Sequence, residues 1–159
     1  MLSRRQRMWD ETIAELGLDP DSIERDADPL VALESWKRIA RHLESAGRPR
    51  EAAEAWDWAV SEALSDEALV LGDGEPTLWE ASAFYERNDA LGSLRATLEQ
   101  AWASLRAGTP VTSGFAVRLL GRLAGVYERM CLLDKAAEAS ARAATLSALA
   151  EPTHMRRCA

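Results

Sequence analysis

The sequence is poor in the residue types that usually carry catalysis or form covalent cross-links. It has two cysteines, Cys131 and Cys158, and two histidines, His42 and His154, in 159 residues. Two cysteines do not make a disulfide framework, and we expect both thiols to be reduced. The histidines are far apart, and no cluster of His, Cys and carboxylate residues has the spacing of a metal site. The sequence therefore predicts a protein that is not an enzyme and needs no cofactor or metal.

Long apolar runs and an excess of positive charge are also missing. No stretch approaches the roughly 18 apolar residues that a membrane-spanning helix needs. The arginines near the N-terminus are not followed by the apolar segment of a signal peptide. The net charge of -7 would repel phosphate groups at long range. We therefore expect a cytoplasmic protein that binds neither membranes nor nucleic acid.

The residues that are abundant favour helices. Apolar residues make up 47% of the chain, and most of them are alanine and leucine, which lose little side-chain entropy in a helix. Between short polar breaks, apolar residues recur at spacings of three and four, as in amphipathic helices. Loops are expected at 19–22, 72–76 and 108–114, with shorter breaks at 47–50, 88–89 and 131–134. No alternating strand pattern is present, so the fold class is predicted to be all-α.

Several predicted helix starts carry capping residues, and two of them place specific helices. Asp28 can supply a cap oxygen, and Pro29, which follows it, has no backbone N–H that needs a partner. Thr77 and Glu80 have the spacing of a capping box, in which each side chain accepts from a backbone N–H of the first turn. These positions predict helices that begin near residues 29 and 77.

An internal 42-residue period decides the expected architecture. Shifting the chain by that period aligns six positions over three units without gaps. The aligned sets are Trp36, Leu78 and Leu120; Ala40, Ser82 and Ala124; Leu43, Tyr85 and Tyr127; Ala52, Leu94 and Ala136; Trp56, Leu98 and Ser140; and Ala59, Ala101 and Ala143. Small residues let two helices approach closely, and large ones fill the space between hairpins. A single hairpin cannot bury its own apolar face, so such units must stack.

This pattern resembles the tetratricopeptide repeat family, whose repeat has a Trp, a large-small pair, a Tyr, and then an aromatic residue between two alanines. The first unit matches best, and the second is weakest because Leu94 stands where alanine is expected. The 42-residue spacing is similar to the longer-helix variety found in kinesin light chains. A nonrepetitive helical bundle, with chance matches among abundant Ala and Leu, is the competing interpretation.

The resemblance implies a short α-solenoid of three helical hairpins, at about 29–71, 72–112 and 113–151. A capping helix with an acidic linker would precede them in residues 1–28, and a flexible tail would follow in residues 152–159. In similar proteins the first helices of the hairpins line a concave groove that receives a partner segment. The residues that this places in the groove are Lys37, Arg38, Arg41, Trp79, Arg87, Arg118, Arg122 and Arg129.

The charge of the predicted groove suggests its partner. Seven basic residues lie on the three first helices against five acidic ones, which gives +2 within a chain of -7. Because the planar guanidinium of arginine donates paired hydrogen bonds to a carboxylate, we expect an adaptor that binds an acidic protein segment. The competing interpretation is that these arginines pair with glutamates one turn away, as Arg38 could with Glu34.

Three further expectations stay open. Trp79 lies beside a repeat position and is either a binding anchor or half-buried packing. A helical sensor domain that binds a small ligand between hairpins is the second functional interpretation. Self-assembly is the third, since an apolar terminal face near Leu146 and Leu149 could pair two chains as a homodimer.

Overall fold

Helices account for all the regular secondary structure that we observe. The computed structural model describes residues 4–24, 27–65, 70–106 and 113–150, and contains no strand in these ranges. The all-α prediction is confirmed, while the predicted tail at 152–159 lies outside the described residues. The elements are α1 (Arg4–Glu15), η1 (Pro20–Ile23), α2 (Pro29–Ser45), α3 (Pro49–Ser65), η2 (Val70–Gly74), α5 (Glu75–Arg87), α6 (Leu91–Arg106), α7 (Ser113–Arg129) and α8 (Leu133–Ala150).

The chain divides into two compact units, which we describe separately. The first unit is Met1–Asn88 and holds α1 to α5, and the second is Asp89–Ala159 and holds α6 to α8. The boundary falls inside the range 72–112 that the period assigns to the second hairpin.

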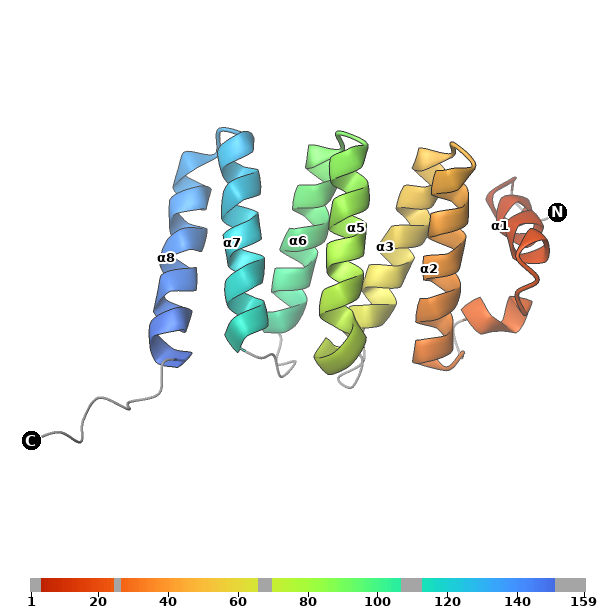
Figure 1. Cartoon of the computed structure of the whole chain (residues 1–159), viewed down its shortest axis with the longest axis horizontal. Coiled ribbons are helices and arrows are strands. Elements are labelled where there is room, and N and C mark those ends of the chain that lie inside the picture. The colour runs from red at the N-terminus through yellow and green to blue at the C-terminus, as the bar shows by residue number, and fades with distance from the viewer. Residues whose placement is uncertain (1–3, 25–26, 66–69, 107–112, 151–159) are drawn as a thin grey trace, which may run out of the picture. The chain divides into compact units, whose positions relative to one another are not determined.

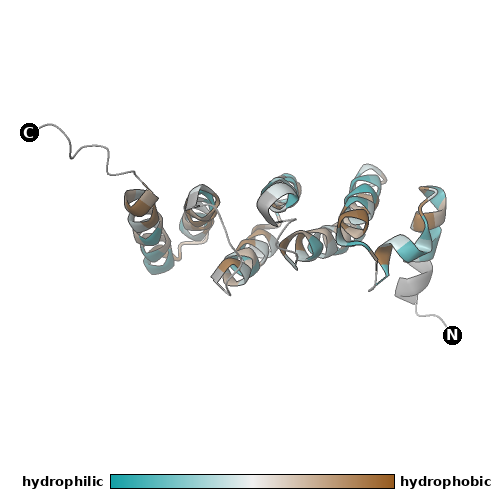
Figure 2. Ribbon diagram, turned by 90° about the horizontal axis from the view of Figure 1, so that it is seen from below, coloured by the Kyte–Doolittle hydropathy of each residue, from teal (hydrophilic) through white to brown (hydrophobic). Residues whose placement is uncertain are grey.

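In the first unit, α2 and α3 form an antiparallel hairpin, and α5 packs against α3 (Figure 1). Apolar residues at helical spacing meet between these helices, and Leu33, Ile39, Leu43 and Trp56 are almost completely buried. Figure 2 shows α2 and α5 on the same side of α3. Burial of one side of each amphipathic helix therefore holds this unit together.

In the second unit, α7 contacts both α6 and α8. It contributes the buried leucines Leu119, Leu120 and Leu123. The last helix, α8, buries only Ala136 and Ala139. Most of α8 is therefore exposed, and the core of this unit lies around α7.

The turns between the helices repeat with the period seen in the sequence. Three turn residues at that spacing, Gly47, Asp89 and Cys131, have positive φ values of 69°, 52° and 58°. In the first of these turns the N–H of Arg48 donates to the carbonyl of Leu43 at 2.9 Å. In the third, Leu132 donates to Tyr127 at 2.8 Å. This left-handed helix end satisfies carbonyl groups that the helix leaves open.

A tyrosine–carboxylate hydrogen bond recurs with the same period. In the first unit, the hydroxyl of Tyr85 on α5 donates to Asp57 Oδ1 on α3. In the second, the hydroxyl of Tyr127 on α7 donates to Glu99 Oε1 on α6 at 2.8 Å. Each tyrosine and each carboxylate thus lies one full period from its counterpart, and the helix pairs that they link correspond as well.

The surroundings of these bonds shift the pKa values of the groups. Burial raises the pKa of Asp57, and although the hydrogen bond from Tyr85 lowers it, the charge of Glu54 adds to the rise. Burial also raises the pKa of Tyr127 to about 12, together with the hydrogen bond to Glu99 and its charge. The Tyr127 hydroxyl therefore keeps its proton at neutral pH and can donate its hydrogen bond to Glu99.

The helix starts agree with the sequence at Asp28 and differ at Thr77. Asp28 Oδ1 accepts from the N–H of Leu30 at 3.0 Å and of Val31 at 3.2 Å, as predicted. The predicted loop at 72–76 and the capping box at Thr77 are wrong. A π-helical turn runs over Val70–Gly74 and α5 begins at Glu75, which leaves Thr77 buried inside the helix. Pro76 fits the first turn of a helix and did not mark a loop.

Candidate binding surface

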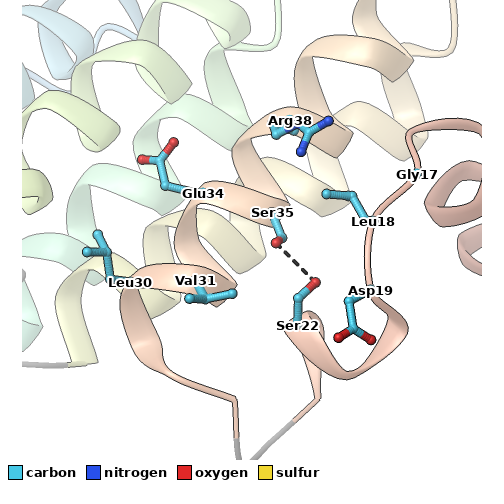
Figure 3. Close-up of a pocket in the computed structure, with 9 residues that line it drawn as sticks. All are labelled: Gly17, Leu18, Asp19, Ser22, Leu30, Val31, Glu34, Ser35 and Arg38. Atoms are coloured by element: carbon cyan, nitrogen blue, oxygen red, sulfur yellow. Dashed lines mark hydrogen bonds between the residues drawn. The ribbon is translucent and has the colours of Figure 1, made fainter.

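A pocket of about 430 Å³ opens beside the first turns of α2 (Figure 3). One wall is α2 itself, and the other is the segment that leads from the end of α1 into η1. The lining residues are Gly17, Leu18, Asp19, Ser22, Leu30, Val31, Glu34, Ser35 and Arg38. The pocket lies wholly within the first unit.

Local backbone chemistry shapes the wall opposite α2. Gly17 has a φ of 61° and ends α1, so that the N–H of Leu18 donates back to the carbonyl of Ile13 at 3.0 Å. This conformation favours glycine because it has no Cβ. Asp19 then caps η1 by accepting from the N–H of Asp21 at 3.1 Å. The chain therefore turns sharply and returns toward α2.

A buried hydroxyl pair fixes η1 against α2. The hydroxyl of Ser35 donates to the hydroxyl oxygen of Ser22 at 3.1 Å, and both side chains are buried. Figure 3 shows this bond between the two walls. Because both partners are buried and paired, separating the walls would leave two polar groups without partners.

The pocket combines exposed apolar side chains with charge at its edge. Leu30 and Val31 are 47% and 50% exposed and lie in the first turn of α2, which Asp28 caps. Arg38 Nη2 donates to the carbonyl of Leu16 at 3.2 Å, which holds the guanidinium beside the pocket. Such a site can take an apolar side chain of a ligand, with Arg38 placed to meet a neighbouring negative group.

Two of the basic residues predicted for the groove, Lys37 and Arg41, form ion pairs that cross from α2 to α5. Lys37 is buried, and its Nζ lies 3.3 Å from Glu80 Oε1 and 3.5 Å from Glu34 Oε1. Arg41 pairs with the second oxygen of Glu80. Most of the observed pairs therefore join two helices, whereas the competing interpretation expected them within one helix.

A second ion pair links the far ends of the same two helices. Arg87 on α5 donates to Glu44 on α2, with Nη2 2.8 Å from Oε1. Together with the Lys37, Arg41 and Glu80 contacts it spans the side of the first unit where α2 meets α5. These cations are partnered by carboxylates of the protein itself.

The charges around Glu80 determine its protonation. Burial acts to raise the pKa of Glu80, but the hydrogen bond from Arg41 and the positive charges of Lys37 and Arg41 outweigh it. The pKa of Glu80 is therefore lower than usual. Glu80 is ionised at neutral pH and balances the two cations.

The remaining predicted residues lie at separate places. Trp79 on α5 is half-buried, and its Nε1 donates to Glu75 Oε1 at 3.0 Å. Arg118, Arg122 and Arg129 are exposed on α7 in the second unit. The structure thus brings Lys37 and Arg41 together at Glu80, pairs Arg87 with Glu44, and places Arg38 at the pocket.

The pocket residues Leu18, Leu30 and Val31 did not emerge from the repeat pattern. A signal was present, because Leu30 and Val31 are adjacent apolar residues in the first turn of α2, outside the aligned positions. A repeat comparison detects residues that recur, and these occur only in the first unit.

The second unit has a smaller pocket, of about 230 Å³, among α6, α7 and α8. Its lining includes the ring of Tyr127, which has Lys135 Nζ 5.6 Å from its centroid. Its lining includes both apolar and charged side chains, and Arg142 pairs with Glu138 at 2.6 Å.

Two further findings apply to the described ranges only. No helix there is long and apolar enough to cross a membrane. No group of three or more His, Cys, Asp and Glu residues in the same ranges is arranged to hold a metal ion. Comparisons with family models, curated proteins and solved structures found no match to this chain.

Proposed function

We propose that the chain is a helical repeat protein of tetratricopeptide type, a short α-solenoid of three hairpins with a 42-residue period. The support is the recurrence of two independent features at that spacing. One is the left-handed turn residue at Gly47, Asp89 and Cys131. The other is the hydrogen bond of Tyr85 to Asp57 and of Tyr127 to Glu99. A nonrepetitive bundle gives no reason for both to share one period.

As its function we propose binding of a segment of a partner protein, in the manner of an adaptor. The observation that carries this is the pocket beside Arg38, with Leu30 and Val31 exposed at its edge. Exposed apolar residues that gather at one concave place are typical of an interaction site. An apolar side chain of the partner would enter the pocket, and a carboxylate next to it would meet Arg38.

The other predicted cations take a different role in this proposal. Lys37, Arg41 and Arg87 are each partnered by Glu80 or Glu44, so they hold α2 to α5 and keep that surface in shape. An acidic partner is thus recognised mainly at Arg38 in the first unit. Arg118, Arg122 and Arg129 stay candidate contacts on α7.

Selection from a displayed library of random peptides tests this proposal. We expect the selected peptides to share an apolar residue next to Asp or Glu. The substitution Val31→Asp places a charge at the pocket and should weaken binding by tenfold or more, whereas Arg38→Gln should mainly reduce the preference for acidic peptides. Arg50→Gln, an exposed change on α3, is the matched control. Selected peptides that bind Val31→Asp as tightly as the unchanged protein would rule out the pocket.

A helical sensor of small ligands is the second candidate, because about 430 Å³ falls within the usual range of ligand pockets. A ligand that raises the melting temperature of the protein, and fails to do so with Val31→Asp, would favour it. Homodimer formation also stays a prediction. Leu149 on α8 is 78% exposed, as a pairing face requires, and light scattering measures the outcome directly.

A further inference from the structure

We infer that Trp58 and Glu62 on α3 form a second interaction surface, which binds an arginine side chain of a basic partner protein. This surface shares no residue with the pocket beside Arg38. The inference therefore does not depend on what that pocket binds.

Trp58 is exposed but held in a fixed orientation. Its indole is 47% exposed, and it stacks on the buried Trp36 with the ring centroids 5.7 Å apart and the planes 15° from parallel. Trp36 is itself fixed by Trp9, whose ring meets it edge-on at 5.4 Å. One face of Trp58 is thus covered by a core residue, and its exposure leaves the other side available to a ligand. The tryptophan side chain would lose little conformational freedom on binding, which lowers the cost of association.

Two of the four residues one turn away from Trp58 on α3 are acidic. Glu54 and Glu62 lie four residues before and after Trp58, and Glu51 lies seven residues before it, so helical geometry places all three on the side of α3 that carries the indole. The one basic residue of α3 is Arg50, in its first turn and eight residues before Trp58. Glu51 is paired with Arg48 at 3.1 Å, and no described cation forms an ion pair with Glu62. One carboxylate oxygen of Glu54 is buried. The flat aromatic surface therefore has the carboxylate of Glu62 beside it.

The chemistry of this surface fits arginine better than other side chains. A cation over the face of an indole is attracted by the negative charge of the ring face, and tryptophan is the best aromatic residue for this contact. A guanidinium can lie flat on the ring and at the same time donate hydrogen bonds to a carboxylate in its plane. Lysine makes the same charge contact but cannot stack. The partner is therefore a segment that presents arginine, and charge complementarity with Glu62 orients it.

Fluorescence anisotropy with short labelled peptides tests the inference on the full chain. The probes are a peptide with two arginines separated by glycine, and the same peptide with two lysines or two glutamates. We expect the arginine peptide to bind best and the glutamate peptide not to bind. Trp58→Ala leaves the charge of the protein unchanged and should weaken arginine binding by about two- to fivefold, and should remove the preference over lysine.

Four further variants test the result. Glu62→Gln should weaken binding of both basic peptides, whereas Glu128→Gln, an exposed glutamate on α7, should not. Trp58→Phe keeps an aromatic ring on Trp36 and should give an intermediate affinity, which decides the question if Trp58→Ala unfolds. Val31→Asp should leave arginine binding unchanged, so a failure of the pocket and a failure of this surface can be told apart.

Two results would overturn the inference. The first is equal affinity of the arginine peptide for the unchanged protein and for both Trp58 variants. The second is equal affinity of arginine and lysine peptides together with equal effects of Glu62→Gln and Glu128→Gln. Either would mean that the net charge of -7 attracts basic peptides without a defined site.

Discussion

The second helices of the first and last hairpins differ much more than the turns that precede them. Both hairpins turn at a residue with positive φ, Gly47 or Cys131, with corresponding backbone hydrogen bonds. Yet α3 buries seven side chains, among them Trp56, while α8 buries only two alanines. The turn conformation therefore recurs with the period. The number of buried side chains on the second helix instead depends on which other helices it contacts.

The largest difference in the free energy of unfolding is expected between variants at two positions that the period aligns, Trp56 and Ser140. Trp56→Ala removes a side chain that is 2% exposed and should lower the free energy of unfolding by about 3–5 kcal/mol. Ser140, two periods further along, is exposed on α8, and Ser140→Ala should change it by less than about 0.5 kcal/mol. Denaturant unfolding measures both. Similar losses at the two positions would break the contrast between α3 and α8.

The turns should respond in opposite directions to exchange of their central residues. Gly47→Ala places a Cβ at a φ of 69° and should cost about 1–2 kcal/mol, although open space surrounds the position. Cys131→Gly relieves the same backbone conformation and should stabilise the protein by about 0.5–1 kcal/mol, after the greater freedom of glycine in the unfolded chain is subtracted. Thermal unfolding of the two variants compares them. A gain for Gly47→Ala would contradict the shared turn geometry.

A smaller effect should mark the ion pairs between α2 and α5. Glu80→Gln leaves Lys37 buried with only Glu34 nearby and should cost about 1 kcal/mol at neutral pH. Because the folded state lowers the pKa of Glu80, its contribution is present above the pKa of the unfolded chain and is lost as the pH falls through the lower, folded value.

The stability difference between the unchanged protein and Glu80→Gln should accordingly shrink as the pH falls from about 5 to 3. Glu44→Gln, which breaks the more exposed pair with Arg87, serves as the control and should cost less than about 0.5 kcal/mol. A larger loss for Glu44→Gln than for Glu80→Gln would reverse this ranking.

The sequence contains local information about the fold that could be read directly. Asp28 and Pro29 indicate a helix start because a cap acts within three residues of its own position. The breaks near Gly47 and Cys131 are visible because the period repeats them. The predicted helix start at Thr77 was wrong because the glycines before Pro76 suggested a loop. The chain continues there as a helix.

The candidate site depends more on contacts between distant residues. Glu80 is far along the chain from Lys37, and the pairing that fixes the role of Lys37 and Arg41 exists only once α2 and α5 lie together. The same holds for Arg38, which was predicted to line a groove and which donates to the carbonyl of Leu16, 22 residues earlier. Composition and period predict where helices run, but not which charges they bring into contact.

Double-mutant cycles at the two tyrosine–carboxylate bonds test the shared repeat most directly. One cycle combines Tyr85→Phe with Asp57→Asn, and the other combines Tyr127→Phe with Glu99→Gln. If one repeat builds both units, both pairs should show a favourable coupling of about 0.5–1.5 kcal/mol in the free energy of unfolding. A coupling near zero in either unit would contradict the common 42-residue repeat.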